Sequence, residues 1–373
     1  MPRNDPEALY PRAPGSTLPG YISPDGRKAL NTIVPRFPLP PVGKTGWPWF
    51  GKEQQTGIDP HLPRITIVTP SYNQAEFIET AIRSVLLQGY PNIEYFIMDG
   101  GSTDGSVEII RRYEPWLSGW VSEPDTGQSH AINKGWRRAT GDIIAWLNAD
   151  DMYYPGAFET ITDTFQSRKD AVVFCGAGAL CDMEGSRLLS RKVPSHMDPY
   201  RMIASCGGVP LQPSVFMKRE VLDDIGYLDA DLHYVMDWEY WIRIGLHYPP
   251  GSIATTDTTL AMNRDWPLTK TNTGVEAICE ENRMILERLF RQYPDDRRLL
   301  AIKDVAYRSS YRKQAELAIK ASLRSQAIRC LFKALCFKPF TMNPLQEIIL
   351  LRKILRTRKP PVEQGSGANR KHT

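Results

Sequence analysis

Residues 64–151 alternate between two hydrophobic periods, which predicts a series of strand, loop and helix units. The β-branched run ITIVTP at residues 65–70 predicts a short buried strand, and AEFIETAIRSVLLQG at residues 75–89 gathers its apolar side chains on one helical face. The same order recurs, with strands predicted at residues 93–100, 120–125 and 142–151 and helices at residues 106–117 and 127–141. Successive units of this kind pair their strands in parallel through right-handed crossovers. We therefore expect an open α/β fold, with a mostly parallel sheet flanked by helices and a ligand site beyond the carboxyl ends of the strands.

The pattern is less regular beyond residue 151. It predicts strands at residues 171–180 and 212–220, a helix at residues 233–247, and a largely helical stretch from about residue 275 to residue 357. Small and apolar residues recur at spacings of three and four over residues 325–340, which is typical of a helical hairpin of the tetratricopeptide kind. We divide the chain into an extension (1–62), an α/β domain (63–272), a helical C-terminal region (273–357) and a disordered basic tail (358–373).

The first 62 residues are rich in proline and glycine and have no useful periodicity, which predicts an irregular extension. Trp47, Trp49 and Phe50 are unusual in such a segment, because aromatic residues rarely stay in solvent. They either clip the extension onto the main domain, the interpretation we favour, or stack on a sugar.

The composition is that of a folded globular protein, with 42% hydrophobic and 24% charged residues among 373. No apolar stretch approaches the roughly 18 residues that span a bilayer, and the N-terminus has no signal-peptide pattern, so we expect a cytoplasmic protein. The six cysteines are scattered without metal-ligand spacing, which favours free thiols over zinc or disulfides.

The net charge of +4 hides an asymmetry along the chain. Residues 281–373 carry 21 Lys and Arg against 8 Asp and Glu, whereas residues 1–280 have a net charge of −9. Segments 322–338 and 347–359 combine apolar faces with basic side chains, the composition of an interfacial helix on an anionic membrane. A helical hairpin with a solvated basic face explains them equally well. We expect no nucleic-acid partner, because no recognised module accompanies the charge.

Acidic residues follow two predicted strands. Asp99 ends an apolar strand and precedes two glycines, so its carboxylate can accept an N–H group of a planar base; a turn that precedes a helix, with Asp104 as its cap, is the alternative. Asp150 and Asp151 adjoin after a very apolar strand, in the run Asn148-Ala149-Asp150-Asp151. Two adjacent carboxylates repel, and a divalent cation would remove that cost, so we expect Mn²⁺ or Mg²⁺ here rather than a solvated turn.

Two further polar segments are weaker candidates. Asp237 lies in an aromatic predicted helix, where desolvation would raise its pKa as a general base requires, and Trp238 and Glu239 beside it could contact an acceptor sugar. A surface acid on an amphipathic helix would look similar. The loop at residues 123–128, with Gly127 and the following Asn133 and Lys134, could touch a ligand or merely form a turn.

The motifs of residues 64–270 together resemble the family 2 glycosyltransferases, inverting enzymes of bacterial polysaccharide type with the Rossmann-like GT-A fold. The runs ITIVTPSYNQ, FIMDGGSTDG, SEPDTGQSHAINKG and DIIAWLNADD occur in the order and spacing of that family. The resemblance implies that the base is held by Asp99 and by the loop after the first strand, Thr69, Pro70, Ser71 and Tyr72. We place Gly127, Asn133, Lys134, Asn148 and Ala149 in the same nucleotide site.

The family's metal-binding DxD motif corresponds here to Asn148-Ala149-Asp150, so the first acid is an amide while Asp150 is kept. The resemblance therefore implies a cation at Asp150, with Asp151 beside it. Its acid pair corresponds to Met236-Asp237, which makes Asp237 the catalytic base. An Arg-x-His element of related enzymes corresponds to Arg264-Asp265-Trp266, so the histidine is missing and Arg264 and Lys270 are candidate phosphate contacts. Residues 207–212 resemble the acceptor-side loop more weakly.

The implied activity is that of an inverting hexosyltransferase. It would move a sugar from a nucleotide-diphosphate donor, preferably a UDP-sugar, to a hydroxyl of a glycan or lipid-linked acceptor in polysaccharide or cell-envelope biosynthesis. A sugar nucleotidyltransferase is disfavoured, because TPSYNQ lacks the basic, glycine-rich loop that handles a triphosphate. A non-catalytic nucleotide or sugar binder of the same fold is also open, since Asn148 and Trp266 depart from the family pattern.

Overall fold

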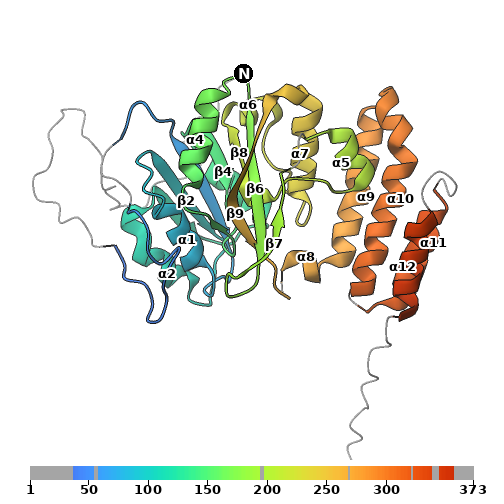
Figure 1. Ribbon diagram of the computed structural model, residues 1–373, viewed down its shortest axis with the longest axis horizontal. Coiled ribbons are helices and arrows are strands. Elements are labelled where there is room, and N and C mark those ends of the chain that lie inside the picture. The colour runs from blue at the N-terminus through green and yellow to red at the C-terminus, as the bar shows by residue number, and fades with distance from the viewer. Residues whose placement is uncertain are drawn as a thin grey trace, which may run out of the picture.

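The computed structural model describes residues 37–53, 58–193, 197–267, 269–320, 322–337 and 344–356. The first 36 residues and the predicted basic tail lie outside the described residues. Strands of one mixed sheet run through the centre of the α/β part, and the last helices lie side by side at one end of the molecule (Figure 1). Among the described helices, none combines the length and the hydrophobicity that a membrane crossing requires.

The sheet has nine strands, eight of them in the order β3-β2-β1-β4-β8-β6-β9-β5, with β7 paired to β6. The first four neighbours in that order pair in parallel, as predicted, and β6 pairs with β9 in parallel. The pairs that join β8 to its neighbours are antiparallel, as are β5–β9 and β6–β7, so the half of the sheet built after residue 151 is mixed. The strands are β1 (Ile65–Ser71), β2 (Ile93–Asp99), β3 (Gly119–Ser122), β4 (Ile143–Trp146), β5 (Met152–Tyr153), β6 (Val173–Cys181), β7 (Arg187–Arg191), β8 (Val215–Lys218) and β9 (Ile253–Arg264).

Helices cover both faces of the sheet. Alternate side chains of each strand point to opposite sides, and here both sides carry apolar residues that need to be buried. In β4, Ile143 and Ala145 belong to one apolar core, whereas Ile144 and Trp146 belong to the other. The first core packs against α1 (Ile78–Leu86), α2 (Ser106–Tyr113) and α4 (Ala157–Ser167), and the second against α3 (Gln128–Trp136), α5 (Pro199–Ser205), α6 (Glu220–Ile225) and α7 (Met236–His247).

The C-terminal helices divide between two cores. Apolar residues of α9 (Val275–Gln292) and of the first part of α10 (Arg297–Lys320) join the second core of the sheet, beside Trp238 and Trp241. The end of α10, α11 (Arg324–Leu335) and α12 (Pro344–Arg356) form a small core of their own. The prediction of a helical hairpin is therefore confirmed by α10 and α11. Helices α9 and α10 also pack against the α/β domain. A short helix, α8 (Lys270–Thr273), precedes them.

The extension is anchored where its aromatic residues lie. The indole N–H of Trp47 donates to the carbonyl of Tyr153 at 2.7 Å. Arg83 of α1, only 2% exposed, donates from its guanidinium to the carbonyls of Pro48 and Trp49. Phe50 remains 60% exposed. The prediction that this segment clips onto the main domain is thus confirmed for Trp47 and Trp49.

Candidate active site

The parallel strands bring the predicted donor-side residues to one edge of the sheet. Ser71 at the end of β1 lies opposite Asp99 at the end of β2, and β4 ends beside β1, just before residues 148–151. Register alone places these segments together, because the carboxyl ends of parallel strands meet at one edge. The strand-order reversal between β1 and β4 makes this edge a natural ligand crevice.

Side chains from the end of β1 differ in what they can offer a ligand. Thr69 is fully buried and its hydroxyl bonds the Tyr95 hydroxyl at 2.9 Å, so it packs in the core. Pro70 pairs with Met98 inside the ladder. Ser71 is 4% exposed, yet its hydroxyl has no hydrogen-bond partner within the described residues, and the ring of Tyr72 is 63% exposed. A buried hydroxyl without a partner is costly, so Ser71 and Tyr72 form the part of this loop that suits a bound nucleotide.

Asp99 is already surrounded by donors. Its carboxylate is fully buried and accepts the hydroxyls of Ser102 and Ser122 and the N–H groups of Gly101 and Ser102. Asp99 therefore holds the loop after β2 in place, and a base would add to these contacts or replace some of them. Asp104 bonds the N–H and the hydroxyl of Ser106 at the start of α2, but the N-cap position is occupied by Gly105, so Asp104 supports the turn without being the predicted cap.

Asp151 is a buried anchor of the loop after β4. It is 0% exposed, and it accepts the side-chain amide of Asn148 at 3.0 Å, that of Asn263 at 2.9 Å and the N–H of Arg264 at 3.0 Å. Burial and the charge of Asp150 raise the pKa of its carboxyl well above the usual range. The prediction that Asp151 ligates a metal therefore does not fit this geometry, since its oxygens are engaged by three donors in the interior.

The Asp150 carboxylate has other partners than that of Asp151. Its carboxylate accepts the indole N–H of Trp266 at 3.3 Å, and its carbonyl accepts Nε of Arg264 at 2.9 Å. Burial raises the pKa of the Asp150 carboxyl, while Trp266, Arg264 and Lys270 oppose that shift. Trp266 occupies the place of the family's missing histidine and supplies an N–H donor there. Sequence reasoning missed this contact, although the position of Trp266 two residues after Arg264 was its signal.

Asn148 links the two sides of the site. Its side-chain oxygen accepts from Gln128 at 2.6 Å, and its amide donates to Asp151 at 3.0 Å and to Gln212 at 3.2 Å. Lys270 in turn donates to the Gln128 side chain at 3.2 Å, which brings its ammonium into the same network. The amide at position 148 thus has both a donor and an acceptor role, which a carboxylate there could not fill. Ala149 is buried in the first core.

Arg264 does not reach outward as a phosphate contact. It is 4% exposed, donates to the carbonyls of Asp150, Asp182 and Met183, and lies over the ring of Phe77 at 4.8 Å. The pairing of β5 with β9 brings it there, because this pairing aligns Met152 with Met262. The guanidinium organises the Asp150 loop, and Lys270 remains the candidate phosphate contact.

The polar residues of α3 and of the loop before it mainly make contacts within the protein. Gly127 has φ +128°, and a Cβ there would lie 2.7 Å from Nδ1 of His233, so only glycine fits. Asn133 is 3% exposed and exchanges hydrogen bonds with the main chain of Leu228, a role that differs from the predicted nucleotide contact. Lys134 is 6% exposed and pairs with Glu123 at 2.9 Å.

Asp237 occupies the first turn of α7. It is half-buried, and of the donors that the structure describes, the N–H of Trp238 bonds its carboxylate, at 2.7 Å. Burial raises the pKa of the Asp237 carboxyl, and the charge of Lys313 opposes that rise. This is the environment that a general base needs.

The neighbours of Asp237 turn into the protein. Trp238 is 4% exposed and donates its indole N–H to the carbonyl of Met202 at 3.3 Å. Glu239 is 8% exposed and pairs with Arg243 at 2.8 Å. The predicted acceptor contacts at Trp238 and Glu239 therefore do not fit, because α7 buries the side on which both lie.

Two residues of the C-terminal helices reach this side of the site, and sequence reasoning missed both. Glu281 of α9 accepts the N–H groups of His233, Tyr234 and Val235, at 2.8 to 3.0 Å, and so fixes the segment that leads into α7. Lys313 of α10 donates to the carbonyl of Cys206 at 3.0 Å. No local pattern signals either contact, since they join residues 46 to 107 positions apart.

The chain was compared with known proteins. Residues 66–226 match the model of glycosyl transferase family 2. A Rickettsia typhi protein described as an uncharacterized glycosyltransferase is 29% identical over 193 residues, which cover 49% of this chain and 59% of that protein. A Bacillus subtilis protein whose name assigns it, as a glycosyltransferase, to teichuronic acid biosynthesis is 34% identical over 117 residues, covering 31% of this chain and 46% of that protein.

Solved structures agree on the fold. Staphylococcus aureus TarS matches with a TM-score of 0.55 and 16% identity, covering 78% of this chain and 53% of TarS. A mannosyltransferase from Pyrobaculum calidifontis, solved with GDP-Man and Mn²⁺, matches with a TM-score of 0.51 and 19% identity, covering 83% of this chain and 85% of that one. The matched part of this chain spans little more than half of the Rickettsia relative. The predicted fold is confirmed, and residues 66–226 form a domain that matches glycosyl transferase family 2, the family that the sequence motifs resemble.

Proposed function

We propose that this protein is an inverting enzyme that transfers a sugar from a nucleotide-diphosphate donor, preferably a UDP-sugar, to a hydroxyl of a glycan or lipid-linked acceptor. The observation that carries the proposal is the placement of two carboxylates, Asp150 in the loop after β4, where it accepts the indole N–H of Trp266, and Asp237 in the first turn of α7, where it accepts the N–H of Trp238. A general base together with a diphosphate site would suit direct displacement at the anomeric carbon.

The nucleotide would lie along the ends of β1 and β2. The partnerless buried hydroxyl of Ser71 and the exposed ring of Tyr72 offer it a hydrogen bond and a stacking surface. Lys270, which donates to the side chain of Gln128, would contact the diphosphate. Uracil is our preference among the bases, and the Pyrobaculum neighbour with GDP-Man keeps guanine as the alternative to test.

Asp150 would hold Mn²⁺ or Mg²⁺, with Asn148 close by. Among the described residues no group of three His, Cys, Asp or Glu side chains could hold a metal alone. A single carboxylate suits these cations, since Mg²⁺ commonly binds one or two carboxylates and completes its shell with substrate phosphates and water. The residues present therefore fit a cation that arrives with the donor. Such a cation would neutralise charge on the leaving diphosphate.

The chain's own groups then divide the work. Asp237 takes the proton of the acceptor hydroxyl, and the oxygen attacks the anomeric carbon from the face opposite the diphosphate, so the configuration inverts. The raised pKa of Asp237 makes it a better proton acceptor than an exposed aspartate. Asp151 and Arg264 hold the Asp150 loop in place while this occurs.

We also propose that the last helices rest on an anionic membrane on the cytoplasmic side, close to a lipid-linked acceptor. α11 and α12 expose large apolar side chains beside exposed basic ones: Ile328, Phe332, Leu335, Ile349, Leu351 and Leu355 beside Arg329, Lys333, Arg352 and Lys353. Sedimentation with phosphatidylglycerol vesicles at low salt tests this. Co-sedimentation that disappears in Phe332→Ser supports the proposal, and a protein that stays in solution contradicts it.

The activity is tested by incubating the protein with UDP-, GDP- and dTDP-sugars and Mn²⁺, and following release of the nucleoside diphosphate. We expect release from one donor class, its loss on chelation and its recovery with Mn²⁺. In the product, the anomeric configuration read by NMR should be inverted. A retained configuration contradicts the mechanism, and formation of pyrophosphate from a nucleoside triphosphate and a sugar phosphate would indicate a nucleotidyltransferase instead.

A further inference from the structure

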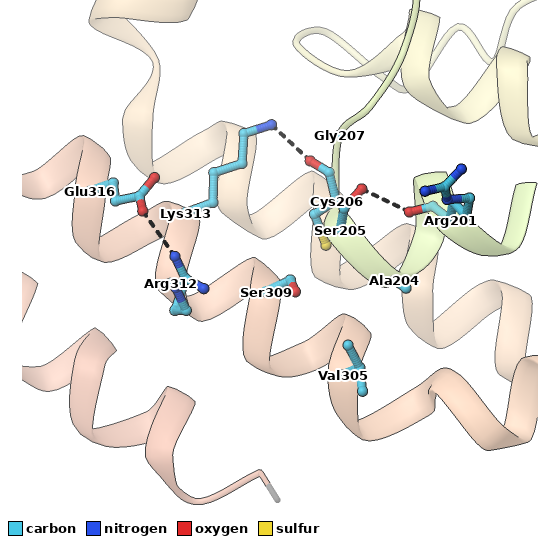
Figure 2. A pocket seen from close by; sticks show the side chains of 10 residues that line it. All are labelled: Arg201, Ala204, Ser205, Cys206, Gly207, Val305, Ser309, Arg312, Lys313 and Glu316. Carbon is cyan, nitrogen blue, oxygen red and sulfur yellow. Dashed lines mark hydrogen bonds and ion pairs between the residues drawn. The ribbon is translucent and has the colours of Figure 1, made fainter. Parts of the chain in front are cut away.

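A cavity of about 570 Å³ opens between α5 and α10, on the acceptor side of the site. One wall is the end of α5 with the following Cys206 and Gly207, and the other is a single face of α10 (Figure 2). The GT-A domain and the helical C-terminal region therefore build it together. None of the residues that line it belongs to the donor site described above.

The lining of the cavity is positive. Arg201, Arg312 and Lys313 face it, against the single acid Glu316, and its other polar side chains are the hydroxyls of Ser205 and Ser309. Arg312 and Glu316 are 3.4 Å apart across one helical turn, so Arg201 and Lys313 carry the excess charge. Guanidinium and ammonium groups converging on a pocket are the usual recognition elements for phosphate and carboxylate.

The wall formed by α5 is held rigidly. Lys313 bonds the Cys206 carbonyl at 3.0 Å, and the Cys206 thiol lies 3.4 Å from the carbonyl of Ala306 on α10. An ammonium group has three N–H donors, so Lys313 can hold the loop and still bind an anion. Arg201 also lines the cavity and is exposed, whereas Arg312 and Lys313 are half-buried, so Arg201 is the most accessible of its three cationic residues.

One wall of the cavity contacts the helix that carries the proposed base. Trp238, the neighbour of Asp237, bonds the carbonyl of Met202 in α5, and the charge of Lys313 acts on the Asp237 carboxyl. The residues of the cavity wall and the helix that carries the proposed base are therefore in contact.

We propose that this cavity binds an anionic group carried by the acceptor, a phosphate or a carboxylate on its glycan, and so selects acidic acceptors. The inference rests on the proposed function, because it names the substrate class on the acceptor side of that site. The excess of basic residues over the last third of the chain is consistent with it.

The test is calorimetric binding of glycerol 1-phosphate to the full chain, at constant ionic strength, with glycerol as the neutral control. We expect saturable binding of glycerol 1-phosphate that Arg201→Gln weakens at least about tenfold, a loss of about 1.4 kcal/mol or more, because the variant removes a charge-assisted hydrogen bond. Arg291→Gln, an exposed arginine of α9 away from the cavity, is the matched control and should leave the affinity unchanged.

Further titrations show whether the bound anion belongs to a glycan or to a lipid surface. Phosphatidylglycerol vesicles that bind in an Arg201-dependent way, while glycerol 1-phosphate does not, would show a lipid surface and overturn the proposal. So would equal weakening by the two arginine variants, or inorganic phosphate binding with no dependence on Arg201. Binding of UDP with Mn²⁺, measured on the same samples, distinguishes a failure of the proposed function from a failure of this inference. If UDP binds but glycerol 1-phosphate does not, only the inference is wrong.

Discussion

The proposed donor side and the proposed acceptor side of the site are built in different ways. On the donor side, Ser71, Asp99 and Asp150 follow strands that pair in parallel, so sheet register brings them together. On the acceptor side, Asp237 stands at the start of a helix whose approach is fixed by Glu281 and whose charge environment includes Lys313. The positions of the donor-side residues therefore follow from the repeated strand and helix units, whereas the position of Asp237 depends on contacts between distant parts of the chain.

This difference implies that the two functions can be separated by mutation. Changes at the acceptor side should alter turnover while nucleotide binding stays intact. Changes on α9 or α10 should reach the chemistry although these helices lie outside the residues that match the family model.

The largest expected effect is that of Asp237→Asn. General-base assistance is worth about 10²–10⁴ in rate, so turnover should fall at least a hundredfold while UDP affinity is unchanged. Steady-state release of the nucleoside diphosphate measures this. Asp231→Asn, an exposed carboxylate on the preceding loop, is the control and should keep full turnover. Retained turnover in Asp237→Asn would remove Asp237 from the role.

Glu281→Ala should act next most strongly. It leaves three N–H groups before α7 without their acceptor, and a lost buried partner costs about 1–3 kcal/mol. We expect urea unfolding at lower concentration and a reduced turnover with little change in UDP affinity. Glu280→Ala changes an exposed acid on the same helix and should do neither. If UDP affinity fell as much as turnover, the acceptor-side role of Glu281 would be wrong.

Trp47→Phe tests the anchor of the extension. It removes the hydrogen bond to the Tyr153 carbonyl while the ring still packs, so the free energy of unfolding should fall by about 1 kcal/mol. Phe50→Leu alters a 60% exposed side chain and should be neutral. A sugar-stacking role would instead appear as a raised KM at unchanged stability.

The smallest expected effect concerns pH. A base acts when deprotonated, so turnover is lost as pH falls through the pKa of Asp237, and burial places that loss above the pH at which an exposed aspartate titrates. Because Lys313 opposes the rise, Lys313→Met should move the acid limb of the turnover profile to still higher pH. An acid limb that stays in place would show that Lys313 does not act on the base.

Sequence reasoning reached the donor side because its signals are local. Strand periodicity and the acids after each strand predicted the parallel half of the sheet, and they placed Asp99 and residues 148–151 at the carboxyl ends of its strands. It could not predict that the Asp151 carboxylate is engaged in the interior while that of Asp150 is not. The hydrogen bonds to Asp151 come from Asn263 and Arg264, in a strand 112 and 113 positions away. Trp238 and Glu239 were placed wrongly for a similar reason, since helix periodicity does not show which face a neighbouring helix covers.

The most direct test of the division between the two sides is one set of calorimetric titrations with UDP, with and without Mn²⁺, on the wild type, Asp150→Ala and Asp237→Asn. The account predicts binding that depends on Mn²⁺ in the wild type, is lost in Asp150→Ala, and is unchanged in Asp237→Asn. UDP binding that survives in Asp150→Ala with the same Mn²⁺ dependence, or that disappears in Asp237→Asn, would contradict it.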